Sequence, residues 1–255
     1  MLLKKWEQLP DDIKNDEVKR YYDILKKKTA SLIIKRVFDV AAALFLLVIL
    51  SPVFLVTAIA IKLESEGPVM YRQVRKTTYG RDFRIHKFRS MYLDSDKGYL
   101  LTTKNDERVT KVGAFIRKTK IDELGQLIDV VKGDMTFVGV RPQVKKYTDH
   151  YTDEMKATLL LPAGITSLAS IYYRNENDLL EGSEDPTGLY LAEILPDKMI
   201  YNLMGIKKLS PLYDLKILIM TLLAVMGKDY KPAKQVYSDV FRKKDGGKSA
   251  EAKGV

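Results

Sequence analysis

Residues 40–61 form an uncharged apolar segment, VAAALFLLVILSPVFLVTAIAI, which limits what this chain can fold into. A helix of about 20 such residues is long enough to cross the hydrocarbon core of a bilayer. The segment lies inside the chain and lacks a small-residue cleavage site, which argues against a secretory signal. It therefore predicts a membrane-embedded helix, and the rest of the chain is expected to fold beside a bilayer.

Ser51 and Pro52 stand at the midpoint of this segment. Proline removes a backbone donor and clashes with the preceding turn, so the helix is expected to kink there, while the serine hydroxyl bonds a freed carbonyl. Both flanks are basic, since residues 1–36 hold ten Lys/Arg against six Asp/Glu. Positive flanks favour the cytoplasmic side. We predict a re-entrant hairpin that breaks at Ser51 and Pro52; a kinked single span is the alternative.

The charge of the chain narrows its partners and its chemistry. A formal charge of +10 and a pI near 9.4 favour an anionic partner: nucleic acid, anionic lipid or a phosphorylated small molecule. The absence of cysteine excludes disulfides and thiolate metal sites, and two distant histidines argue against zinc. No nucleic-acid motif is recognised, and the membrane segment argues against that class. Catalysis is left to Asp, Glu, Lys, Arg, Tyr or a carboxylate-bound hard cation.

Two adjacent carboxylates, Asp122 and Glu123, lie between a basic cluster that includes Arg117 and a single downstream arginine, Arg141. Apolar residues from 121 to 131 follow helical spacing on the face opposite Asp122, and Thr119 is a candidate N-cap. A helix N-terminus and adjacent cations lower a carboxyl pKa and also bind phosphate. The pattern predicts a carboxylate that attacks phosphorus; a plain capping box with a surface acid is the alternative.

A basic hairpin is expected upstream. Residues 69–75 and 81–91 alternate as strands around a turn at 76–80, and seven Lys/Arg against one Asp lie between Tyr71 and Arg89. Lys87 and Arg89 are the candidates for a phosphate-binding wall. The alternative is a basic face turned to solvent or lipid.

Four stretches, taken in order, resemble the motifs of the bacterial sugar transferase family, the monotopic phosphoglycosyl transferases. They are KRVFD at 35–39 followed by Ser51-Pro52, then residues 73–91, 117–142 and 162–175. The resemblance extends over residues 35–221. The sequence departs from the usual family residue at Thr77, Gly125, Asp129, Val140, Ser167, Ser170, Tyr173 (commonly glycine) and Asn202 (often aspartate). The differences within 162–175 are expected to mark a subgroup with its own sugar preference.

The resemblance implies an activity and a set of roles. Members move a sugar 1-phosphate from a UDP-sugar to a polyprenyl phosphate, with undecaprenyl phosphate expected here, and release UMP. The aspartate matching Asp122 carries a covalent phosphosugar, and Glu123 matches its partner in the dyad. Both are implied ligands of Mg2+, or Glu123 orients a phosphate. The implied phosphate-binding residues are Lys87, Arg89, Arg117, Arg141 and Arg174.

The expected fold is α/β and mostly helical, with a re-entrant helix-break-helix joined to a compact catalytic domain that holds a small sheet or hairpin. We expect an amphipathic arm at 1–34, helical over 11–28 and lying on the bilayer or in solvent. A membrane hairpin at 35–62, a catalytic domain at 63–242 and a disordered tail at 243–255 follow. Residues 211–226 predict a core helix or a shallow bilayer contact.

The expected location is the cytoplasmic face of the bacterial inner membrane, held in one leaflet, and homo-oligomerisation is left open. The enzyme is expected to initiate the synthesis of a surface glycan. An alternative from another class is a non-catalytic membrane-bound adaptor whose basic face holds anionic lipid.

Overall fold

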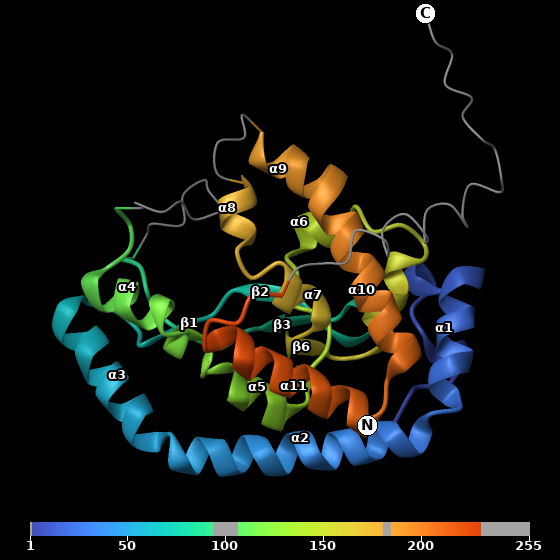
Figure 1. Cartoon of the computed structure of the whole chain (residues 1–255), viewed down its shortest axis with the longest axis horizontal. Coiled ribbons are helices and arrows are strands. Elements are labelled where there is room, and N and C mark those ends of the chain that lie inside the picture. Colours follow the sequence, from blue (N-terminus) through green and yellow to red (C-terminus); the bar gives the residue numbers. More distant parts are fainter. Residues whose placement is uncertain (1, 94–106, 181–184, 231–255) are drawn as a thin grey trace, which may run out of the picture.

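The computed structural model describes residues 2–93, 107–180 and 185–230. The described part is mostly helical with small sheets, as the sequence predicts (Figure 1). Its helices are α1 Asp16–Lys26, α2 Thr29–Ile49, α3 Ser51–Glu64, α4 Lys111–Lys118, α5 Gln126–Lys132, α6 Lys145–Thr148, α7 Leu168–Tyr172, α8 Glu176–Leu180, α9 Pro186–Leu189, α10 Leu195–Lys208 and α11 Pro211–Val225. The tail expected at 243–255 lies outside the described residues.

The strands are short and form three two-stranded sheets within the described residues. Antiparallel pairs join β1 Met70–Tyr71 to β4 Lys87–Phe88, and β2 Val74–Lys76 to β3 Asp82–Arg84. The predicted hairpin over 69–91 is therefore present. A parallel pair joins β5 Met135–Val138 to β6 Ala163–Thr166 in the centre of the body.

Thr77, at a position where the resemblance implies glycine, connects the hairpin to the central pair of strands. Its hydroxyl donates to the carbonyl of Asp134 and accepts from the backbone N–H of Ala163 at 3.2 Å. The turn that follows places Tyr79 at φ 58° and Gly80 at φ 72°. The threonine thus adds two hydrogen bonds that glycine has no side chain to make.

Helices α2 and α3 meet at an angle of 61° at the break between Ile49 and Ser51. The hydroxyl of Ser51 donates to the carbonyl of Val48 at 2.8 Å, and Pro52 lies in the first turn of α3, where its missing N–H is tolerated. In Figure 1, α2 runs along one edge of the body and α3 turns away from that line.

No described helix alone has the length and apolar content to cross a bilayer; only the bent pair meets that test. Large apolar side chains on its outer face stand exposed: Val37, Phe38, Leu44, Phe45, Val48, Leu55, Val56 and Leu63. The bend lies where the sequence places it, and the re-entrant path through a bilayer stays a prediction.

Three charged residues fasten α2 to the body. The Lys35 ammonium donates to Asp214 of α11 at 2.7 Å, and Asp39 accepts from the Thr136 hydroxyl. Arg36 donates to the carbonyls of Val130 and Val131 at 2.6 and 3.0 Å, where α5 ends. Asp39, which precedes the apolar segment in the sequence, is therefore buried inside the protein.

The N-terminal arm is part of the body. Helix α1 is shorter than the predicted 11–28 helix because separate 3-10 turns precede it, and Asn15 caps its start by accepting from the N–H of Val18 at 2.8 Å. Its apolar face packs against the turn at 155–160 and against α10. The Lys28 ammonium donates to the carbonyls of Lys207 and Leu209. This apolar face is therefore covered by protein and not by lipid.

The central core lies between α2, α5 and the strands. It contains Ala43, Phe83, Ile85, Leu127, Val130, Met135 and Ala163. Gly133, at φ 89°, ends α5 and lets the chain enter β5 at once. The loop after β5 is thereby fixed in position, and that loop carries Arg141.

We expect Gly164→Ala to lower the free energy of unfolding by about 2 kcal/mol or more, because backbone cannot yield as a flexible side chain does. A Cβ on Gly164 would lie 2.2 Å from the backbone N and O of Gly139. The measurement is thermal or denaturant unfolding in detergent. Gly205→Ala is the matched control, since its Cβ would meet Tyr213 at an ordinary 3.5 Å. Equal stability of the two variants would contradict this packing.

Candidate active site

The two carboxylates lie in a short turn, not in the helix that their periodicity predicts. Thr119 ends α4, and Lys120 then adopts the left-handed conformation at φ 60°. A 3-10 turn Ile121–Glu123 follows, and α5 begins only at Gln126. The predicted N-cap role of Thr119 is therefore wrong, because its hydroxyl donates back to the carbonyl of Phe115 at 2.9 Å.

Glu123 is held by two cations. It accepts from the Lys87 ammonium of β4 at 2.9 Å and from the Arg141 guanidinium of the loop after β5. Burial acts to raise the pKa of Glu123, but Arg141 and Lys87 outweigh it and hold that pKa well below its usual value. Glu123 in turn raises the pKa of Arg141 above its already high ordinary value. Glu123 and Arg141 therefore stabilise each other's charged forms, whereas burial lowers the pKa of Lys87.

The pKa of Asp122 is shifted in the opposite direction from that of Glu123. Burial raises its pKa above the ordinary value of 3.8, and the cations Lys87, Lys120 and Arg117 compensate only in part. Its Oδ2 lies 3.8 Å from the Lys87 ammonium, and its Oδ1 is buried without a hydrogen bond in the described part of the chain. The expected lowering of this pKa is wrong, because the turn removes the carboxyl from water without giving it a donor.

A cavity of about 600 Å³ borders this cluster. Its cationic and polar side includes Arg75, Arg117, Lys120, Glu123, Arg141 and Arg174. Its apolar side includes Leu46 and Leu50 from the bent helix pair, Leu124 and Leu127 beside the dyad, and Ala224 and Val225 of α11. One cavity thus connects a charged wall with apolar side chains of the bent helix pair and of α11.

The structure brings together most of the predicted site. Arg117, Arg141 and Arg174 line the cavity with Glu123, while Asp122 and Lys87 contact Glu123 or adjoin it without bordering the cavity. Arg174 donates to the carbonyl of Ala224 and lies 3.6 Å from Asp229, so it closes the α11 side.

Arg89 is placed elsewhere. Its guanidinium donates to the carbonyls of Ser65 and Glu66 and to the Ser65 hydroxyl, and its side chain is buried. These bonds hold the end of α3 against β4. Arg89 is therefore not part of the wall of the cavity, although it lies only two residues after Lys87 in the same basic hairpin.

Sequence reasoning missed a further group on the same cavity: Gln143, Tyr147, Glu176, Tyr190 and Lys198. Lys198 of α10 and Glu176 of α8 form an ion pair across 22 residues of sequence. The tyrosine rings of Tyr147 and Tyr190 pack at a centroid distance of 4.7 Å. Nothing in the local sequence signals these contacts, since they arise when α8 and α10 fold over the central strands.

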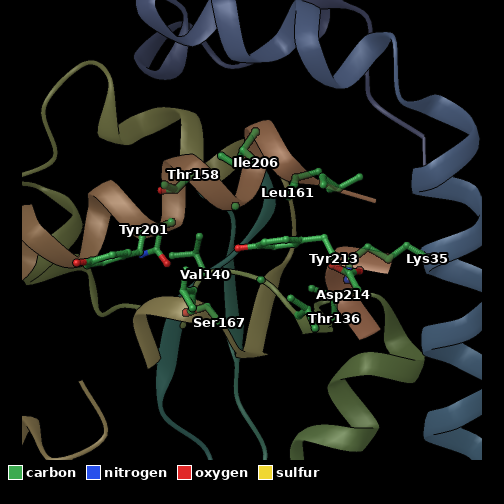
Figure 2. A pocket seen from close by; sticks show the side chains of 16 residues that line it. Lys35, Thr136, Val140, Thr158, Leu161, Ser167, Tyr201, Ile206, Tyr213 and Asp214 are labelled. Carbon is green, nitrogen blue, oxygen red and sulfur yellow. The ribbon is translucent and has the colours of Figure 1, made fainter. Parts of the chain in front are cut away.

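A second, smaller cavity of about 40 Å³ lies between α2, β5, α10 and α11. Figure 2 shows Lys35 entering it from α2 at one side and Tyr201 of α10 at the other. Asn202, at the place where relatives often have aspartate, also lines it. This space is too small for a nucleotide sugar, so its polar residues serve the attachment of α2.

The carboxylates were tested for their fit to a metal. No group of three His, Asp or Glu that suits a metal ion occurs among residues 2–93, 107–180 and 185–230. Mg2+ is commonly held by one or two carboxylates together with substrate phosphates. Oδ1 of Asp122, which is buried but makes no hydrogen bond in the described part of the chain, fits that role, whereas Glu123 fits it only after releasing Lys87 or Arg141.

The chain belongs to the bacterial sugar transferase family, whose profile matches residues 30–228. It is 37% identical over 196 residues, 75% of this chain and 40% of the relative, to a UDP-glucose:undecaprenyl-phosphate glucose-1-phosphate transferase of Klebsiella pneumoniae. A transferase of the same name from Caulobacter vibrioides (strain ATCC 19089 / CIP 103742 / CB 15) is 35% identical over 199 residues, 76% of this chain and 70% of the relative.

A third relative carries a different sugar in its name. The UDP-N-acetylgalactosamine-undecaprenyl-phosphate N-acetylgalactosaminephosphotransferase of Aeromonas hydrophila is 47% identical over 123 residues, 48% of this chain and 29% of the relative. The chain thus spans 40% or less of the Klebsiella and Aeromonas relatives. Similarity alone leaves the sugar open.

We expect Glu123→Gln to lower the free energy of unfolding by about 2 kcal/mol at neutral pH, because Lys87 and Arg141 lose their shared anion. The folded-state pKa of Glu123 lies below its ordinary 4.5, so its contribution is present above that value and is lost as the pH falls further. Denaturant unfolding between pH 7.5 and 3.5 measures this. Asp149→Asn, which breaks an exposed pair with Lys145, should change stability by less than about 1 kcal/mol.

Asp122→Asn should have the opposite effect and stabilise the fold at neutral pH. Its raised pKa means that the ionised form is disfavoured in the folded state, and the amide removes that charge. The advantage of the variant should shrink as the pH falls through the raised pKa toward 3.8, where the wild-type carboxyl is protonated. Unfolding at several pH values checks this, with exposed Asp12→Asn as the control. A destabilised Asp122→Asn protein would contradict the assignment.

Proposed function

We propose that this protein transfers a sugar 1-phosphate from a UDP-sugar to a polyprenyl phosphate, namely undecaprenyl phosphate, and releases UMP. The observation that carries the proposal is one cavity bounded by Glu123 and several arginines on one side and by apolar residues of the bent helix pair on the other. That cavity suits a hydrophilic donor and an acceptor with a long apolar tail, because the phosphosugar has to pass from the first to the second. The names of the relatives support the same reaction.

Asp122 is the nucleophile in this proposal. A carboxylate oxygen attacks the β-phosphorus of the UDP-sugar, the bond between that phosphorus and the bridging oxygen breaks, and UMP leaves with the bond electrons. The phosphosugar remains on Asp122 as an acyl phosphate. An oxygen of the polyprenyl phosphate then attacks the same phosphorus, and the carboxylate of Asp122 is regenerated with release of the polyprenyl-diphosphate sugar.

The cations neutralise the diphosphate, which otherwise repels an incoming carboxylate. Arg117, Arg141 and Arg174 line the cavity, and Lys87 lies between the two acids. In the absence of substrate, Glu123 pairs with Lys87 and Arg141. An incoming diphosphate competes with Glu123 for these two cations, so Glu123 holds them in place until the donor binds.

The raised pKa of Asp122 also has a role in this reaction. A buried carboxylate that lacks a hydrogen bond at Oδ1 is poorly solvated, and poor solvation makes an anion more reactive toward phosphorus. Lys87 beside Oδ2 lowers the pKa of Asp122 and so favours its ionised form. Asp122 would hold Mg2+ together with the substrate, and the ion would supply further neutralisation of charge.

The apolar side of the cavity is the proposed site for the polyprenyl chain. Leu46 and Leu50 line it from the bent helix pair, and Val225 lines it from α11. A re-entrant path of α2 and α3 in one leaflet brings this side to the level of the lipid tails. The proposed location is the bacterial inner membrane, with the acids on its cytoplasmic face.

The decisive test combines turnover with trapping of the intermediate. Wild-type protein with a UDP-sugar, polyprenyl phosphate and Mg2+ should release UMP, and Asp122→Asn should lower that release at least a thousandfold while remaining folded, because an amide forms no acyl phosphate. Donor labelled in its β-phosphate and sugar, supplied without acceptor, should leave label on the peptide containing Asp122. An adaptor releases no UMP, and label on another residue would overturn the assignment of the nucleophile.

A further inference from the structure

The cavity has a wall that the transfer of phosphate does not use. Lys198 of α10 is 7% exposed and donates to Oε2 of Glu176. The Lys198 ammonium also lies 5.5 Å from the ring centroid of Tyr190 and 5.9 Å from that of Tyr173. All four side chains line the cavity. They form a compact surface with one carboxylate, one buried cation and two aromatic rings, which we name the tyrosine wall.

The charge of the tyrosine wall does not suit a diphosphate. Glu176 neutralises Lys198, so this wall offers no net positive charge, whereas Arg117, Lys120 and Arg141 offer it nearby. A carboxylate facing the cavity repels phosphate but accepts hydrogen bonds from hydroxyl groups. Aromatic rings beside such an acceptor supply an apolar surface for the C–H faces of a sugar. The chemistry of the wall is that of a polyol site.

The position of the wall agrees with the geometry of the donor. Glu176 acts electrostatically on Arg141, and Arg141 bonds Glu123 next to the proposed nucleophile. The hexose of a UDP-sugar is attached directly to the β-phosphate, whereas the uridine lies beyond the α-phosphate. A hexose carried by a β-phosphate that binds beside Arg141 therefore fits the side of the cavity that Glu176 lines.

Tyr173 gives this wall a property of its own. It stands where the resemblance to the family implies glycine, and its hydroxyl donates to Asp197, the neighbour of Lys198 on α10. The ring is thereby fixed between α7 and α10, in a volume that glycine leaves open. The relatives named above differ in the sugars that their names give, and a ring fixed in this wall of the cavity is placed to choose between such sugars.

We propose that Glu176, Lys198 and Tyr173 bind the hexose of the donor and determine which UDP-sugar the protein uses. The Glu176 carboxylate accepts hydrogen bonds from sugar hydroxyls, Lys198 fixes the orientation of that carboxylate, and the Tyr173 ring limits the shape of the sugar. This inference rests on the proposed transfer from a UDP-sugar and adds the residues that discriminate among such donors.

The test compares donors that differ at single positions of the ring: UDP-glucose, UDP-galactose, UDP-N-acetylglucosamine and UDP-N-acetylgalactosamine. Release of UMP gives kcat/KM for each, and inhibition by UDP, which lacks the hexose, reports binding of the nucleotide alone. Wild type should prefer one donor over its C4 epimer roughly tenfold or more, as expected of a site that hydrogen-bonds a hydroxyl.

Glu176→Gln should lower kcat/KM for the preferred donor roughly tenfold or more, reduce the ratio between the epimers and leave inhibition by UDP within twofold of wild type. Glu193→Gln, an exposed acid that does not line the cavity, is the matched control and should change neither. Tyr173→Leu, which removes the ring and its hydroxyl but keeps an apolar side chain, should relax the preference between plain and N-acetylated sugars.

The outcomes separate this inference from the proposed function. If wild type releases UMP but treats the four donors alike, or if folded Glu176→Gln and Tyr173→Leu keep the wild-type ratios, the hexose assignment is overturned and the transfer stands. Weakening of UDP inhibition equal to the loss in kcat/KM places the nucleotide on this wall and also overturns the assignment. If wild type releases UMP from no donor, the proposed function and this inference fall together.

Discussion

The structure depends on charge buried at the junction between an apolar helix and the body of the protein. Lys35, Asp39 and Asp214 lie there with little contact with water, and an unpaired charge in such a place is strongly destabilising. The Lys35 ammonium satisfies Asp214 directly, and Asp39 bonds the start of β5 through Thr136 and the N–H of Phe137. These bonds work only in one register of α2 on β5, so they fix the helix and the strand together. The loop that follows β5 carries Arg141, and its place beside Glu123 follows from this register.

Neighbouring acids in one turn acquire different roles through their surroundings. Glu123 faces two cations and is held as an anion, so it organises the charge of the cavity. Asp122 is withdrawn from water with one oxygen unbonded, so it is the less stabilised anion of the two. The left-handed Lys120 makes this possible, because it turns the chain out of the α4 direction just before the dyad. A continuous helix would place both acids at its surface.

Much of this arrangement can be predicted from sequence, and the remainder has identifiable physical causes. Proline predicts the break at Ser51-Pro52, and the alternating pattern predicts the basic hairpin. Opposite charge predicts the contact of Glu123 with Arg141. The left-handed conformation of Lys120 cannot be predicted in this way, because the position holds neither glycine nor asparagine. Lys87 and Arg89 lie two residues apart in the same hairpin, yet Lys87 bonds Glu123 of the dyad and Arg89 bonds the backbone at Ser65. Tertiary packing sets this difference. The Glu176–Lys198 pair needs two helices to meet, which no local pattern describes.

Helix α1 precedes the region that matches the family profile, yet it packs into the same core as that region. The family profile begins at residue 30, but the side chains of Val18, Tyr21 and Leu25 belong to the same core as Leu203 and Ile206 of α10. Helix α10 carries Lys198, so residues before the region of homology help to hold a wall of the cavity. The region that matches the family profile therefore begins later in the chain than the region that packs into one core. Residues outside the matched region thus supply part of the core on which the matched region packs.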